Sequence, residues 1–121
     1  MPSLEISTNV GPKDLDAFVK TVSKKFSEGI GKPEQFCLVT FNQVQQLSYA
    51  GSSEPGFIAH ITSIGHIDNE RNANLSASIS QIFQEELNIS NTRGYFFFHD
   101  ARGEDTGYSG TTFTNYVAQK K

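Results

Sequence analysis

One order of predicted elements occurs twice along the chain, and this duplication limits the possible folds more than any other feature. A strand, an amphipathic helix and a second strand fill the first half, and the same order starts again near Phe57. A duplicated β-α-β unit predicts an α+β chain of the two-layer α/β kind. We expect a four-stranded mixed sheet with two antiparallel helices on one face.

The first copy of the unit is marked by changes of hydrophobic period. Residues 3–8 alternate between apolar and polar side chains, which is strand periodicity. Apolar residues then recur at steps of three and four over 15–30, as in an amphipathic helix, and Gly31 is a stop signal. Residues 36–41 are β-prone and nearly all apolar, and 47–50 is a candidate hairpin partner.

The second copy repeats this order with different residues. Residues 57–62 form an apolar run that predicts a further central strand. Asp68 or Asn69 can cap a second helix, in which apolar residues keep helical spacing over 75–87. Residues 95–98, a tyrosine followed by three phenylalanines, then predict the closing strand.

The predicted sheet has a face that the chain alone does not cover. Two helices cover one face, yet the three strands predicted over 36–41, 57–62 and 95–98 are apolar on both faces. No residues are left to form another layer. We therefore expect a homo-oligomer in which the sheets of several subunits meet around a shared interior.

The composition excludes several classes of partner. With 121 residues the chain has the length of one domain, and its formal net charge of −3 is too small and of the wrong sign for a general nucleic-acid binder. No apolar run reaches the roughly 20 residues that span a bilayer, so we expect no membrane insertion. The first residues lack the basic and apolar blocks of a signal peptide. We expect a cytoplasmic protein, with leaderless secretion left open.

The cysteine and the histidines predict neither a disulfide nor a metal site. Cys37 is the single cysteine, and on a predicted buried strand it is most simply a small core residue. His60, His66 and His99 lack the spacing of metal ligands. We therefore expect no metal.

Seven short motifs occur in an order that characterises one family. They are Pro2 directly after Met1, Thr8-Asn9-Val10, Gly31-Lys32-Pro33, Gly51-Ser52-Ser53-Glu54-Pro55, Ser63-Ile64-Gly65, Tyr95 and Thr112-Phe113. On these residues the chain resembles the macrophage migration inhibitory factor and D-dopachrome tautomerase family of the tautomerase superfamily. The motifs run from Pro2 to Phe113, so we expect a family domain over 1–113 and a C-terminal extension over 114–121.

The resemblance implies both an assembly and an activity. The assembly is a homotrimer whose sheets surround a central channel, with the helices outside. The activity is cofactor-free keto-enol tautomerisation of small aromatic acids, of the phenylpyruvate tautomerase or dopachrome isomerase type. Several family members also act outside cells as cytokines in innate immunity, which would add a cell-surface receptor to the partners.

The resemblance assigns the role of general base to Pro2. Removing a proton next to a carbonyl requires an uncharged base, and a chain-terminal proline is a secondary amine that can serve. Neighbouring positive charge and apolar burial would both disfavour its protonated form. The role depends on removal of Met1, because a proline nitrogen within the chain is a tertiary amide without a basic lone pair.

Three further residues carry over as substrate-binding positions. Lys32 is the candidate to hold a substrate carboxylate and to lower the pKa of Pro2. On composition alone, a lysine between a glycine and a proline would be a solvated surface residue, and only the resemblance reverses this reading. Ile64 would meet the substrate through its backbone, and Ser63 beside it is a weaker candidate.

The remaining substrate-binding positions are aromatic. Tyr95 and Phe97 would enter the pocket from a neighbouring subunit, while Phe36, Tyr108 and Phe113 would form walls. Phe97 replaces a polar amide of the best-known members, Tyr108 replaces their tryptophan, and Phe36 replaces their tyrosine. These departures put the substrate preference in doubt.

Other interpretations stay open at this stage. The chain has Gly56-Phe57-Ile58-Ala59 where some members have a Cys-x-x-Cys pair, so we expect no redox activity from that segment. A cytokine-like binding protein with a vestigial, weakly active pocket is the main alternative to an enzyme, and a structural trimer with neither activity is another. The tail over 114–121 is either a frayed terminus or, through Tyr116 and Val117, a segment packed on an adjacent subunit or near the pocket mouth.

Overall fold

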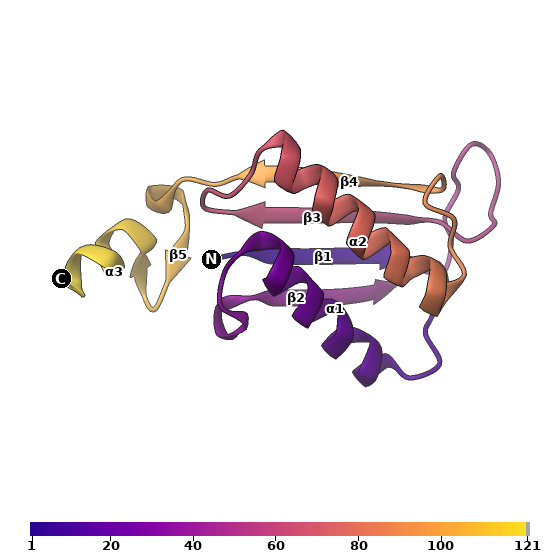
Figure 1. Ribbon diagram of the computed structural model, residues 1–121, viewed down its shortest axis with the longest axis horizontal. Coiled ribbons are helices and arrows are strands. Elements are labelled where there is room, and N and C mark those ends of the chain that lie inside the picture. The colour runs from indigo at the N-terminus through magenta and orange to yellow at the C-terminus, as the bar shows by residue number, and fades with distance from the viewer. Residues whose placement is uncertain (121) are drawn as a thin grey trace.

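A mixed four-stranded sheet with two helices on one face forms the body of the molecule. The computed structural model describes residues 1–120, and Figure 1 traces its elements. In chain order they are β1 (Ser3–Thr8), α1 (Leu15–Ile30), η1 (Glu34–Phe36), β2 (Leu38–Gln43), β3 (Phe57–Ser63), α2 (Asn69–Leu87), β4 (Gly94–Asp100), η2 (Gly103–Asp105), β5 (Gly107–Tyr108), β6 (Thr111–Thr112) and α3 (Phe113–Gln119). The strand order is β2-β1-β3-β4. Strand β1 is parallel to β2 and antiparallel to β3, and β3 is parallel to β4, so the predicted fold class is confirmed.

The two long helices begin and end where local chemistry dictates. Asp14 accepts a hydrogen bond from the backbone N–H of Ala17 at 3.1 Å and caps the start of α1. Gly31 ends α1 with φ of 73°, a left-handed conformation that glycine adopts without steric cost. Asp68 caps α2 in the same way as Asp14 caps α1, and Asn88 ends α2 with φ of 56°.

The core lies between the helices and one face of the sheet. The edge-on contact of Phe57 with Phe83, with ring centroids 4.9 Å apart, joins β3 to α2, and Phe18 of α1 stacks on Phe83 at 6.3 Å. These rings belong to one cluster of buried side chains, namely Leu4, Ile6, Phe18, Val22, Phe26, Ile30, Phe57, Ala59, Ile61, Leu75, Ile79, Ile82, Phe83, Leu87 and Ile89. Helix α2 therefore buries the apolar residues that its periodicity selects, and α1 does so from Phe18 to Ile30, whereas Leu15 at its start is exposed.

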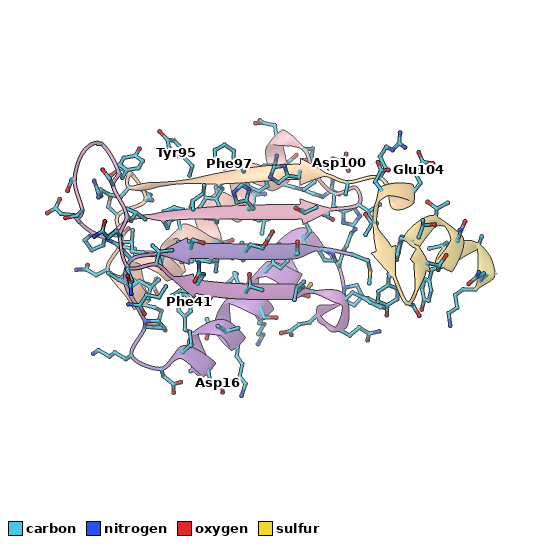
Figure 2. The ribbon with its side chains drawn as sticks, turned by 180° about the vertical axis from the view of Figure 1, so that it is seen from behind. Asp16, Phe41, Tyr95, Phe97, Asp100 and Glu104 are labelled. Atoms are coloured by element: carbon cyan, nitrogen blue, oxygen red, sulfur yellow. The ribbon has the colours of Figure 1, made fainter. Side chains whose placement is uncertain are left out.

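The other face of the sheet is open, as Figure 2 shows from behind. Leu38, Ile58, Tyr95 and Phe97 lie on this face with exposed fractions of 60%, 38%, 58% and 45%. The same face also carries polar side chains, namely Thr40 and Asn42 on β2, His60 and Thr62 on β3 and His99 on β4. The prediction that these strands are apolar on both faces was therefore too strong. An uncovered apolar patch nevertheless remains in the single chain.

Two details of the first β-α-β unit differ from expectation. Strand β2 starts at Leu38 rather than at residue 36, because η1 turns the chain after Pro33. The segment 47–50 is not a strand, since Tyr49 forms one isolated bridge to Ser52 across a tight turn. The loop that contains this segment is instead held by the side chain of Arg93.

Arg93 fastens this loop to the start of β4. Its guanidinium donates hydrogen bonds to the backbone carbonyls of Tyr49, Ser52, Glu54 and Pro55 at 2.8–3.2 Å. It also lies over the ring of Tyr49, 5.2 Å from the centroid. A single cation thereby orders the loop, because five guanidinium N–H groups match several carbonyls at once.

The C-terminal segment lies beyond the end of the sheet, on the side where the chain begins (Figure 1). Strands β5 and β6 form a short hairpin whose turn residues, Ser109 and Gly110, have φ of 55° and 82°. Thr112 then caps α3 by accepting a hydrogen bond from the N–H of Asn115 at 3.1 Å. Over 1–120, no helix is both long enough and apolar enough to traverse a lipid bilayer.

Candidate functional site

A small cavity lies where the start of the chain, the end of α1 and the C-terminal segment meet. Its volume is about 230 Å³, and its lining residues are Met1, Pro2, Lys32, Pro33, Phe36, Phe113 and Tyr116. Four of the predicted site residues, Pro2, Lys32, Phe36 and Phe113, therefore surround one space. Of the seven lining side chains, only that of Lys32 carries a charge.

A second cavity of about 450 Å³ adjoins the first. Met1, Pro2 and Phe36 line both cavities, and Tyr108 lines the larger one together with residues of β1, β2 and β3. The aromatic walls predicted at Phe36 and Tyr108 are thus brought to the same end of the sheet as Pro2.

Lys32 is positioned by the turn that ends α1. Its ammonium donates a hydrogen bond to the carbonyl oxygen of Ile64 at 2.6 Å, which brings a further predicted residue to the site. Burial lowers the pKa of Lys32 from its ordinary value, and the charge of Asp100 opposes this shift. Within residues 1–120 the ammonium forms no ion pair, so its remaining donors are available to an anion.

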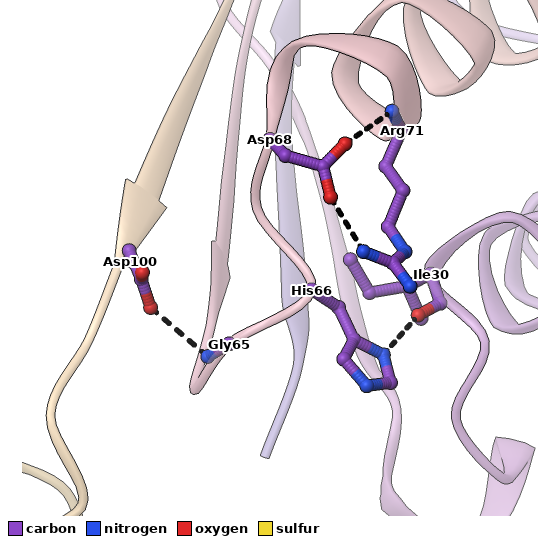
Figure 3. Close-up of polar contacts among 6 residues, drawn as sticks. All are labelled: Ile30, Gly65, His66, Asp68, Arg71 and Asp100. Atoms are coloured by element: carbon purple, nitrogen blue, oxygen red, sulfur yellow. Dashed lines mark hydrogen bonds and ion pairs between the residues drawn. The ribbon is translucent and has the colours of Figure 1, made fainter.

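The turn that carries Ile64 is tied to three elements, as Figure 3 shows. The N–H of Gly65 donates to Asp100 Oδ1 at 2.9 Å, at the end of β4. His66 Nδ1 lies 2.7 Å from the carbonyl oxygen of Ile30, at the end of α1. Because Asp68 caps α2 directly after this turn, the carbonyl that Lys32 contacts is held by the ends of a strand and of two helices.

The electrostatics at the start of the chain favour an uncharged amine. Burial lowers the pKa of the Met1 amino group, and the positive charge of Lys32 lowers it further. Met1 is half-buried, whereas Pro2 is buried. With Met1 attached, the Pro2 nitrogen is an amide and is not basic.

Ser63 brings a buried hydroxyl to the same region. It is fully buried, and its Oγ has no hydrogen-bond partner among residues 1–120. Strand β1 pairs with β3 so that Ser3 faces Thr62, and one further step of this antiparallel register sets Pro2 opposite Ser63. Cys37, which also lines the larger cavity, is half-buried, and burial raises the pKa of its thiol.

Tyr95 and Phe97 do not reach the Pro2 cavity within one chain. The register aligns Ser3 with Thr62 and Thr62 with His99, so His99 is the residue of β4 at the level of Ser3. Tyr95 lies four residues before His99 on that strand. Four residues of strand correspond to about 13 Å. Figure 2 shows both side chains on the open face, with Tyr95 near the end of the sheet away from the C-terminal segment.

The structure bears on one alternative left open by the sequence and adds one contact that the sequence did not predict. Tyr116, expected in a frayed terminus, on an adjacent subunit or near a pocket mouth, lines the Pro2 cavity. His60 Nδ1 and His99 Nε2 lie 3.0 Å apart on the open face, in a row of stacked rings that continues to Phe97. Their separation of 39 residues left no local signal, because only the pairing of β3 with β4 brings them together.

Known proteins match this chain over more than nine-tenths of its length, in sequence and in fold. A sequence profile of the family described as macrophage migration inhibitory factor matches residues 1–114. A macrophage migration inhibitory factor homologue from Trichuris trichiura is 34% identical over 114 residues, covering 93% of this chain and 100% of that protein. The solved structure of the macrophage migration inhibitory factor from Trichinella spiralis superposes with a TM-score of 0.84 at 32% identity, covering 92% of this chain and 99% of that one. A homologue from Prochlorococcus marinus gives a TM-score of 0.86 at 26% identity, covering 92% and 98%.

Proposed function

Because the chain belongs to the macrophage migration inhibitory factor family, we propose that it is a cofactor-free keto-enol tautomerase acting on small aromatic keto acids such as phenylpyruvate. The observation that carries this proposal is the cavity of about 230 Å³ that Pro2, Lys32, Phe36 and Phe113 share. The cavity combines a candidate base for proton removal, a cation for the carboxylate of an aromatic 2-keto acid and aromatic walls for its ring.

Pro2 is the general base once Met1 has been removed. Its secondary amine takes a proton from the carbon next to the substrate carbonyl, and the C–H electron pair forms the new C=C bond. The π pair of the carbonyl moves onto its oxygen, which takes the proton back from the protonated amine; this completes the enol and returns the amine to its neutral form. The reaction is an isomerisation, so it needs no oxidant or reductant.

Lys32 has two tasks in this mechanism. Its ammonium pairs with the substrate carboxylate through donors that Ile64 does not use. Its positive charge, together with burial, also keeps the pKa of the Pro2 amine low. The pKa of the Met1 amino group, which burial and Lys32 both lower, supports this. Phe36 and Phe113 hold the aromatic ring and exclude water, which strengthens both electrostatic effects.

We propose that the active form is a homotrimer. The exposed apolar side chains of the open sheet face support a partner subunit on that face. Tyr95 and Phe97 are too far from Pro2 in their own chain to touch its substrate, so in this proposal they complete the pocket of a neighbouring subunit. Phe97 then offers an apolar surface to the distal end of the substrate.

Replacement of Pro2 tests the enzymatic proposal. Intact mass spectrometry first establishes that Met1 is absent, and the rate of phenylpyruvate tautomerisation is then compared between the wild type and Pro2→Gly. We expect a loss of at least about 100-fold, the usual contribution of a positioned base. Equal rates in the two Met-free proteins would refute the assignment of Pro2.

A second function rests on the departures in the aromatic walls. Phe97 and Tyr108 stand where the best-known members have an amide and a tryptophan, which favours a weaker pocket on a secreted, cytokine-like immune modulator. Tautomerase activity near the uncatalysed rate, together with saturable binding to the surface of immune cells, would select this alternative. Full activity without cell binding would select the enzyme alone.

A further inference from the structure

The C-terminal extension adds a residue to the Pro2 cavity. Tyr116 lies beyond residues 1–114, which the family profile matches, yet it lines the same cavity as Pro2 and Lys32. The cavity has a volume of about 230 Å³ with Met1 still attached, and Tyr116 supplies one of its aromatic walls. A ring at this position therefore takes up space that a larger ligand would need.

Several contacts fix the ring of Tyr116. It packs edge-on against Tyr108, with centroids 4.9 Å apart and an interplanar angle of 89°, and it stacks on Phe113 at 6.1 Å and 27°. The ammonium of Lys120, the residue directly after α3, lies 5.3 Å from the centroid of the ring. The backbone N–H of Phe113 donates to the carbonyl oxygen of Thr106 at 2.8 Å and holds the start of α3.

Tyr116 and Tyr108 also occupy the border between the two cavities. Tyr116 lines the smaller cavity and Tyr108 the larger one, while Met1, Pro2 and Phe36 line both. The edge-to-face pair therefore sets how far a ligand anchored at Lys32 can extend toward the C-terminal segment. Removing the Tyr116 ring would enlarge the smaller cavity on its aromatic side and leave Lys32 in place.

We propose that Tyr116 is a specificity-determining residue, which limits the site to keto acids with a single small aromatic ring and disfavours fused-ring keto acids. This inference rests on the proposed tautomerase function and deepens it. Tyr116 stacks on the ring of the substrate and contacts neither the carboxylate nor the carbon that loses its proton. Its loss therefore changes KM and substrate choice rather than the chemical step.

The test compares phenylpyruvate with indole-3-pyruvate in Met-free wild type and Tyr116→Ala. For phenylpyruvate we expect KM to rise about five- to tenfold, the value of one aromatic contact, with kcat within about twofold. For indole-3-pyruvate we expect kcat/KM to rise, so that the ratio of the two specificity constants shifts at least tenfold. Val117→Ala, on the same helix and away from both cavities, is the matched control and should leave the ratio unchanged.

Two further variants guard against a purely structural effect. Tyr116→Phe retains the ring and should restore the wild-type preference, whereas Tyr116→Trp fills the cavity and should lower kcat/KM for both acids. Thermal melting of each variant shows whether α3 has been lost. A parallel change for both substrates, or an unchanged ratio in Tyr116→Ala, would overturn the proposal.

Failure of the proposed function gives a different result. If the Met-free wild type does not accelerate tautomerisation at all, the enzymatic proposal fails, and Tyr116 is then tested by binding alone. Saturation-transfer NMR with phenylpyruvate and indole-3-pyruvate should still show a preference for phenylpyruvate that Tyr116→Ala reverses. Equal preferences in both proteins would overturn the role of Tyr116 independently of catalysis.

Discussion

In the proposed mechanism, the charge of Lys32 links binding of the substrate carboxylate to the protonation state of the Pro2 amine. The ammonium of Lys32 is partly desolvated, and it depresses the pKa of the amine at the start of the chain. A base works in its unprotonated form, so activity is present above the pKa of that amine and is lost as the pH falls through it. A cation beside the amine therefore extends activity to lower pH.

Lys32→Met is expected to move the acid limb of the pH profile. Without the ammonium, the pKa of the Pro2 amine rises, so the acid limb of kcat/KM moves to higher pH. The KM for phenylpyruvate also rises, because the carboxylate loses its partner. The measurement is kcat/KM for the Met-free protein between about pH 5 and pH 9.

A matched lysine separates this effect from a change of net charge. Lys20 pairs with Asp16 on the exposed side of α1, at 2.9 Å, and its side chain is 76% exposed. Lys20→Met removes the same charge and should leave the acid limb and KM unchanged. An acid limb that stays in place in Lys32→Met would exclude an electrostatic role for this residue.

At the scale of single elements, the C-terminal turn of α1 sets the direction of Lys32. Gly31 has φ of 73°, and a Cβ atom added there would lie 3.6 Å from its nearest neighbour, His66 Nδ1. The substitution therefore meets no clash, and its cost comes from the left-handed backbone alone. Any relaxation of this strain would rotate the residue that follows, which is Lys32.

Gly31→Ala is expected to destabilise the fold by about 1 kcal/mol and to raise KM for phenylpyruvate. Gly51→Ala is the matched control, because Gly51 has φ of 77° and open space around its Cβ position, in a loop remote from the cavity. Chemical denaturation should give similar losses for both variants, with a change of KM only for Gly31→Ala. A change of KM in both would mean that it follows stability and not the position of Lys32.

Hydrophobic periodicity predicted some elements of the fold and not others. The bounds 3–8 and 15–30 were predictable, because long alternating or helical patterns bury one side of an element. The loop held by Arg93 was not, since the partners of that side chain are backbone carbonyls, which leave no mark on the sequence. The hairpin at Ser109-Gly110 is marked in the sequence by a turn dipeptide, although its flanking strands are too short to show a period.

The candidate site was only partly predictable for a related reason. The motif residues Pro2, Lys32 and Phe113 come from three distant segments, and the family resemblance predicted that they share one site. Tyr116 carried no such motif, and a helix of seven residues is too short for a clear apolar stripe. The sequence left open whether the extension frays or packs near a pocket, and the structure places Tyr116 at the Pro2 cavity.

For the whole molecule, assembly and activity should fail together. Ile58 lies on the open face beside Tyr95 and is 38% exposed. In Ile58→Asp a charge would be buried between subunits, so we expect trimers to dissociate into folded monomers that have lost tautomerase activity. Analytical ultracentrifugation gives the mass, and circular dichroism checks the fold.

Leu15→Asp is the control for assembly. Leu15 is 51% exposed at the start of α1, on the helical side of the molecule, where an added carboxylate is compatible with the helix N-terminus. This variant should keep the mass and the activity of the wild type. A monomeric wild type, or a fully active monomer in Ile58→Asp, would refute the shared pocket.

Met1 and Tyr116 line one cavity although they lie near opposite ends of the sequence. In the proposed mechanism Pro2 and Tyr116 both act at this cavity, so a tag joined close to either residue would disturb the site. A leader fused ahead of Pro2 would abolish the base, and a fusion after Lys121 would load the helix that carries Tyr116. Recombinant material intended for kinetics is best made untagged, or released by a protease that leaves proline as its first residue.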